Sequence, residues 1–112
     1  MRFLILVLAV VLTACSSSKP DLIEAVPLYP NETPELRALI EAAAAENEIP
    51  VALVQKVVIR ESTHRPSARN GPYYGLMQIL PATARSMGFR GQPRDLLDAE
   101  TNLRYATRYL RG

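Results

Sequence analysis

Two amphipathic stretches, one on each side of Pro50, constrain the fold of this chain more than any other feature. Before the proline, apolar side chains recur every three or four residues, at Leu36, Leu39, Ile40, Ala43 and Ala44. After it, the same spacing returns at Leu53, Val54, Val57 and Val58 and leads to Glu61. This spacing matches a helical turn of 3.6 residues, so each stretch predicts a helix with one buried face. Thr33 suits the N-cap of the first helix, and Pro34 suits its first position.

The remainder of the domain predicts two more helices. Residues 62–75 are rich in turn-forming residues, and a brief helix is expected from Pro81 to Gly88. After a break over residues 90–95, Asp98 is expected to cap a last helix whose buried face carries Leu103, Ala106, Tyr109 and Leu110. No pair of strands is predicted. The expected fold class is mainly α, with one small helical domain over residues 34–112.

Residues 1–14 have the layout of a signal peptide. Arg2 precedes ten apolar residues, Phe3 to Leu12, which are too few to span a bilayer core of roughly 30 Å. The stretch LTAC, ending at Cys15, resembles the lipobox of bacterial lipoproteins, which implies that Cys15 is lipidated. Ser16, by the same resemblance, favours an anchor on the periplasmic face of the outer membrane. The alternative is an ordinary secretory signal with an incidental cysteine.

Residues 15–33 predict a tether between this anchor and the domain. Pro20, Pro27 and Pro30 recur without a sustained period, and proline favours extended backbone. A flexible coil of that length would span about 20–25 Å. The alternative is that residues 26–30, VPLYP, dock on the domain.

Composition argues against several function classes. A net charge of +2 is too small to suggest nucleic-acid binding. The chain has no C-x-x-C pair, no G-x-G-x-x-G and no G-K-[ST], so zinc, dinucleotide and P-loop sites have no support, and neither a metal nor a cofactor is expected. Cys15 has no second cysteine as a disulfide partner. A monomer is expected.

Glu61 is the candidate catalytic residue, because it ends an apolar stripe on the second helix. Desolvation there, together with the negative end of the helix dipole, favours the neutral acid that glycoside cleavage requires. The alternatives are a side chain turned to solvent or paired with an arginine; Arg60 is expected to point elsewhere. No Asp or Glu occurs over the 33 residues from Ser62 to Arg94, so one carboxylate could serve as both acid and base unless Asp95, Asp98 or Glu100 folds back.

The run from Arg60 to Ala84, RESTHRPSARNGPYYGLMQILPATA, resembles the catalytic signature of the soluble lytic transglycosylases, a lysozyme-like family. Glu-Ser is followed fourteen residues later by GLMQI and then by Pro-x-Thr-Ala. TNLRYATRYL, residues 101–110, resembles a later segment of the family. The resemblance implies cleavage of the β-1,4 bond between N-acetylmuramic acid and N-acetylglucosamine in peptidoglycan strands, with formation of a 1,6-anhydro ring and without added water.

The resemblance also implies residue roles. Glu61 would be the acid and then the base, and Ser62 would position the N-acetyl group of the substrate. The expected substrate-binding residues are Ser62, Asn70, Tyr74, Gly75, Met77 and Gln78. Structural alternatives remain, because Met77 could be plain core, Gln78 could hold a loop, and only one of Tyr73 and Tyr74 is expected to face sugar. His64 is expected to face solvent.

The departures from the family pattern lie in the loop and at the end of the chain. Arg69-Asn70 stands where serine is frequent, Leu80 replaces a methionine, and Ala106 replaces a glycine. The family continues past the Tyr-Leu segment, so the domain is expected to be incomplete at its C-terminus and to expose Leu103, Ala106 and Leu110 as an apolar patch. Alternative functions are a muramidase hydrolase and a non-catalytic peptidoglycan-binding lipoprotein or inactive fragment.

Overall fold

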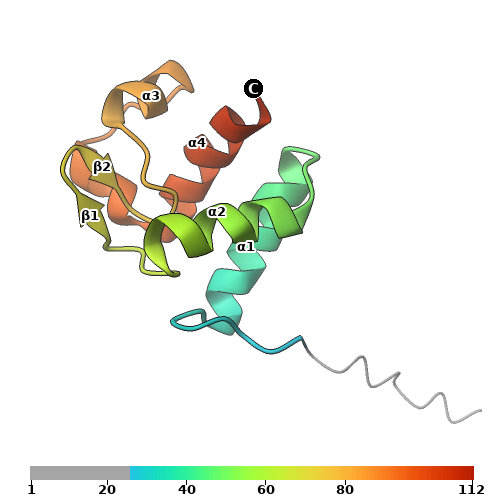
Figure 1. Cartoon of the computed structure of the whole chain (residues 1–112). Coiled ribbons are helices and arrows are strands. Elements are labelled where there is room, and N and C mark those ends of the chain that lie inside the picture. The colour runs from blue at the N-terminus through green and yellow to red at the C-terminus, as the bar shows by residue number, and fades with distance from the viewer. Residues whose placement is uncertain (1–25) are drawn as a thin grey trace, which may run out of the picture.

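The computed structural model describes residues 26–112, so the predicted signal peptide, Cys15 and most of the predicted tether lie outside the described residues. The described part is mainly helical, as expected (Figure 1). Its elements in chain order are α1 (Pro34–Glu46), α2 (Val51–Ser62), β1 (Arg69–Asn70), β2 (Tyr73–Tyr74), α3 (Pro81–Ser86), the 3-10 helix η1 (Pro93–Leu97) and α4 (Ala99–Arg111). Within residues 26–112, no helix is long and apolar enough to cross a membrane.

Helix α1 packs against both α2 and α4, and it lies partly behind α2 in the view of Figure 1. The predicted N-cap is confirmed, because the Thr33 hydroxyl oxygen accepts a hydrogen bond of 3.1 Å from the Leu36 amide. The buried face of α1 is the predicted one, except that Leu39 is only partly buried. Burial of this apolar face is the main contribution of α1 to stability, since each fully buried large aliphatic side chain contributes roughly 1.5–3 kcal/mol.

The apolar stripe of α2 divides into two parts. Val54 and Val58 are fully buried in the core, whereas Leu53 is 41% exposed and Val57 is half-buried. The prediction of one continuous buried stripe up to Glu61 is therefore wrong. Residues three and four apart on a helix differ in direction by tens of degrees, so Val54 and Val58 point into the core while Val57 and Glu61 line a groove.

A short hairpin connects α2 to α3, and the expectation that the domain has no strand pair is wrong. Strands β1 and β2 are antiparallel, with Arg69 opposite Tyr74 and Asn70 opposite Tyr73. The turn between them contains Gly71 at a φ of +56°. The hairpin was missed because two-residue strands are too short to show an alternating pattern.

The segment after the hairpin is held against α4 by one buried side chain, Asn102. Its Nδ2 group donates to the carbonyl oxygens of Tyr74 (2.8 Å) and Leu96 (2.9 Å), and its Oδ1 atom accepts from the amide of Met77 (3.0 Å). Gly75 lies directly against this amide group: a Cβ atom there would stand 2.4 Å from Asn102 Nδ2. Asn102 thus fixes the loop that carries Met77 and Gln78.

Helix α4 is capped as predicted, because Asp98 Oδ2 accepts from the Thr101 amide at 3.0 Å. Leu103 and Ala106 are buried and Leu110 is partly buried, so the expected exposed patch of these three residues is wrong. Tyr109, expected on the buried face, is instead 58% exposed. The buried face of α4 carries polar Asn102 and Thr107 in addition to the apolar side chains.

The N-terminal segment, residues 26–33, contacts the domain. Tyr29 stacks on His64 with ring centroids 5.3 Å apart, and the Asn31 side-chain amide donates to the Thr63 carbonyl oxygen at 3.0 Å. His64 is only 1% exposed, so the expectation that it faces solvent is wrong. This burial could not be predicted locally, because Tyr29 and Glu32, which help to cover His64, lie more than thirty positions earlier in the chain.

Candidate functional site

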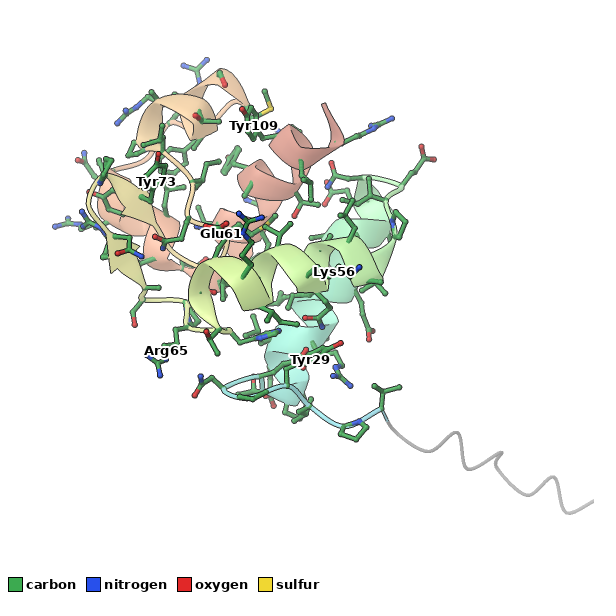
Figure 2. The ribbon with its side chains drawn as sticks, in the orientation of Figure 1. Tyr29, Lys56, Glu61, Arg65, Tyr73 and Tyr109 are labelled. Atoms are coloured by element: carbon green, nitrogen blue, oxygen red, sulfur yellow. The ribbon has the colours of Figure 1, made fainter. Side chains whose placement is uncertain are left out.

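An open groove of about 770 Å³ runs between α2, the hairpin, the start of α3 and the end of α4. In Figure 2, Glu61 projects from α2 on the side toward Tyr73 and Tyr109, while Tyr29 and Arg65 lie on the other side of the helix. The volume falls within the usual range of pockets for small organic molecules. The residues lining the groove are Val57, Glu61, Asn70, Tyr73, Met77, Gln78, Ile79, Leu80, Thr83, Ala106, Tyr109 and Leu110.

Glu61 lies in the last turn of α2 and its side chain is 36% exposed. Apolar Val57, one turn earlier on α2, and Met77 line the groove together with it. Arg60 Nε lies 3.8 Å from Glu61 Oε1, so the expectation that Arg60 points elsewhere is wrong. The Arg60 side chain is 87% exposed, and such exposed pairs contribute at most about 1 kcal/mol. Arg60 can therefore leave the carboxylate to a ligand at little cost.

Within residues 26–112, Glu61 is the only carboxylate among the residues that line this groove. Asp95 and Asp98, which could have folded back toward it, line a separate depression beside Phe89 and Tyr105. Glu100 lies 3.6 Å from Arg104 on the exposed face of α4. Chemistry in this groove that needs a proton donor and then an acceptor would have to use Glu61 for both.

The wall opposite α2 combines an apolar surface with a polar one. Met77 is 8% exposed, and its sulfur accepts a weak hydrogen bond of 3.6 Å from the buried Thr107 hydroxyl. Gln78 has a positive φ of 50°, and its Nε2 group donates to the carbonyls of Ala68 (3.1 Å) and Gly75 (2.9 Å). Its Oε1 atom has no hydrogen-bond partner among the described residues. Gln78 therefore holds the loop, and its Oε1 atom is itself buried.

The structure brings four of the seven expected site residues onto this groove: Glu61, Asn70, Met77 and Gln78. Ser62 lies beside Glu61 but lines an adjoining shallow depression with Asn70, and its hydroxyl donates to the Val58 carbonyl at 3.1 Å. Tyr74 does not line the groove, because the Arg69 guanidinium covers its ring at 3.6 Å.

Gly75 also lies outside the groove lining, packed against Asn102 and the Leu96 carbonyl. Its missing side chain thus serves close packing within the protein. Tyr73, which pairs with Asn70 across the hairpin, lines the groove, whereas Tyr74 does not.

Sequence reasoning missed Thr83 and Tyr109, which also line the groove. Tyr109 was assigned to the core by helical spacing, although a tyrosine with an exposed position on one edge of a helix is also typical of a ligand-binding rim. Thr83 gave no signal beyond its place in the first turn of α3. Among residues 26–112, no group of three His, Cys, Asp or Glu side chains could hold a metal ion.

A second cluster of ionisable groups lies on the other side of α2 from the groove. Burial alone would raise the pKa of Glu32, but hydrogen bonds from Arg37, the Tyr29 amide and Gln55 outweigh it and hold that pKa below its usual value. Burial lowers the pKa of His64, against the opposing attraction of Glu32 Oε1, which lies 4.0 Å from His64 Nε2. Glu32 is thus held charged and His64 neutral.

Comparison with known proteins agrees with this geometry. No solved structure matches the chain. The family model described as Transglycosylase SLT domain matches residues 38–112, which include α2, the hairpin, the loop with Gln78 and α4. That range covers most of the chain and every residue lining the groove. The family expected from the sequence is thus confirmed. The chain belongs to the transglycosylase SLT domain family, whose members cleave peptidoglycan.

Proposed function

We propose that this protein is a peptidoglycan lytic transglycosylase that cleaves the β-1,4 bond between N-acetylmuramic acid and N-acetylglucosamine. The observation that carries this proposal is the solitary position of Glu61. It is the one carboxylate that the described part of the chain places on the groove, and the family match covers all the lining residues. A hydrolase with two carboxylates needs an acid and a base or nucleophile on opposite sides of the bond. One carboxylate suits a reaction in which the same group gives and then takes a proton.

In the proposed reaction, the neutral Glu61 side chain protonates the glycosidic oxygen as its bond to the anomeric carbon breaks. The N-acetyl group of the muramoyl residue assists at that carbon, in place of a second enzyme carboxylate. Glu61, now ionised, takes the proton from the muramoyl 6-hydroxyl, whose oxygen closes onto the anomeric carbon. The product is a 1,6-anhydro sugar, and no water is consumed.

The other wall residues would bind the glycan strand. Ser62 already donates its proton to the Val58 carbonyl, so its oxygen is free to accept from the N–H of the substrate's acetamido group. Asn70 offers an exposed side-chain amide, and Gln78 holds the loop that carries Met77. Met77, Tyr73 and Tyr109 supply apolar and aromatic surface of the kind that packs against sugar rings. Tyr74 and Gly75 do not line the groove, and they would support the loop through their contacts with Asn102.

The proposed location is the periplasmic face of the outer membrane, with a lipid anchor on Cys15. The support is the lipobox-like LTAC sequence together with the periplasmic site of action of the family. The described domain would then lie within reach of the peptidoglycan.

The test is incubation of the purified full chain, in detergent, with peptidoglycan, followed by mass spectrometry of the soluble products. The parent should release anhydro-muropeptides, and Glu61→Gln should reduce that release by at least 10³-fold because no other groove carboxylate can replace it. Glu100→Gln is the matched control, since it removes a carboxylate that pairs on the exposed face of α4, and it should leave the rate unchanged.

Two other results would identify alternative functions. Products with reducing ends would identify a muramidase hydrolase, with water as the acceptor. Binding of the folded parent to peptidoglycan without any release would identify a non-catalytic binding protein. Either result would refute the transglycosylase reaction.

A further inference from the structure

The turn that ends α2, directly after Glu61 and Ser62, has an uncommon backbone. Thr63 and His64 both lie in the left-handed region, with φ values of 51° and 60°. Thr63 is β-branched, and for such a residue this conformation is a genuine outlier. Conformations of this kind persist only where the surrounding structure imposes them.

Tyr29, Asn31 and Glu32 cover the turn. The Asn31 side-chain amide donates to the carbonyl of Thr63 at 3.0 Å, and the Tyr29 ring stacks on the imidazole of His64 with an interplanar angle of 14°. We call the segment from Tyr29 to Glu32 the strap. Figure 2 places Tyr29 on the side of α2 opposite to Glu61, so the strap reaches the turn from behind the groove.

A chain of buried hydrogen bonds fixes the strap to the turn. The Glu32 carboxylate accepts from both guanidinium nitrogens Nε (3.1 Å) and Nη2 (2.8 Å) of Arg37 and from Gln55 Nε2 (2.8 Å). This orients the Gln55 amide so that its Oε1 atom faces His64 Nε2 at 2.7 Å and accepts from it. The Glu32 charge therefore selects the His64 tautomer with a proton on Nε2. All of these side chains except Arg37 belong to residues that are less than one-tenth exposed.

None of the strap residues, nor Gln55 or His64, lines the groove. The strap also precedes residue 38, where the family match begins. It contacts α2 through Gln55, and the turn after α2 through Thr63 and His64. Since Glu61 lies in the last turn of α2, a change in the Thr63–His64 turn is passed to it through two peptide units.

We propose that the strap, through Gln55 and His64, positions Glu61 for catalysis by imposing the left-handed turn that ends α2. This inference rests on the proposed function. Without the strap, the turn can relax toward ordinary helical or extended backbone, and the last turn of α2 moves with it. Displacements of about 1 Å at a reacting group can reduce a rate by about 100-fold while substrate binding is preserved.

The test uses Asn31→Ala in the full chain, because this change loosens the strap and leaves the side chains of the buried Glu32 cluster in place. It removes the exposed hydrogen bond to the Thr63 carbonyl and puts alanine at a positive φ of 66°. With soluble glycan strands as substrate, kcat should fall at least tenfold and KM should stay within twofold of the parent. Arg108→Ala is the matched control: it removes another exposed side-chain donor, to the Met87 carbonyl, and should leave kcat unchanged.

A second substitution separates positioning from general loss of stability. Asparagine adopts the left-handed conformation far more readily than threonine. Thr63→Asn should therefore restore most of the lost kcat in the Asn31→Ala background and change little in the parent. Unchanged kcat in Asn31→Ala, or a failure of Thr63→Asn to restore it, would overturn the positioning role while the parent remains active. Absence of product from the parent itself would refute the proposed function, and the positioning role with it.

Discussion

Asn102 connects three backbone segments, and its replacement by alanine should damage the domain more than any other single polar substitution on α4. The change removes the hydrogen bonds to the Tyr74 carbonyl, the Leu96 carbonyl and the Met77 amide. Leu96 is fully buried and Met77 is 8% exposed, so their backbone groups have little access to replacement water.

The size of the effect follows from these contacts. Leaving a buried backbone group without a partner costs roughly 1–3 kcal/mol. Two such groups and the half-buried Tyr74 carbonyl together give a loss of about 3–5 kcal/mol in the free energy of unfolding. For a domain of this size that corresponds to a decrease in Tm of about 15–30 °C.

Thermal unfolding followed by circular dichroism would measure the decrease. Thr107→Val is the matched control, because Thr107 is equally buried on the same helix but its hydroxyl makes only the weak bond to Met77 sulfur. We expect the control to lose less than about 1 kcal/mol. A loss below about 1 kcal/mol in Asn102→Ala as well would show that Asn102 does not anchor the loop, and the account of the groove wall would fail with it.

Two further predictions concern Gly75 and His64. Gly75→Ala should lower the free energy of unfolding, measured in urea titrations, by about 3 kcal/mol or more. The reason is that φ at Gly75 is +75° and that the new Cβ would lie 2.4 Å from Asn102 Nδ2 and 2.5 Å from the Leu96 carbonyl oxygen. A loss below about 1 kcal/mol would contradict this packing. For His64, burial lowers the pKa in the folded state, so below the ordinary value of 6.5 the unfolded chain binds more protons than the folded one. Its stabilising contribution is complete above pH 6.5 and is lost as the pH falls from there through the lowered pKa, by at most about 1.4 kcal/mol per pH unit. Tm measured between pH 7 and pH 5 should decrease in the parent and decrease less in His64→Phe; equal decreases in both would exclude His64 as the source.

The local features of this fold could be read from the sequence because they depend on neighbours in the chain. The helical spacing of apolar residues, the caps at Thr33 and Asp98 and the turn-rich stretch after Ser62 are all set within one or two helical turns. Glu61 also stood out locally, as a carboxylate at the end of an apolar stripe. In the structure it lines the groove together with Asn70, Met77 and Gln78.

What only the tertiary structure decided depends on residues far apart in the sequence. His64 is buried because Tyr29, Glu32 and Gln55 surround it, and no pattern near His64 announces them. Tyr109 keeps the helical spacing of a core residue, yet it is 58% exposed and lines the groove. Among the described residues, the position of η1 and α4 likewise places Asp95 and Asp98 in another depression and leaves Glu61 as the one carboxylate on the groove. Periodicity reports which face of a helix is apolar, whereas the packing of one helix on another determines how much of that face is covered.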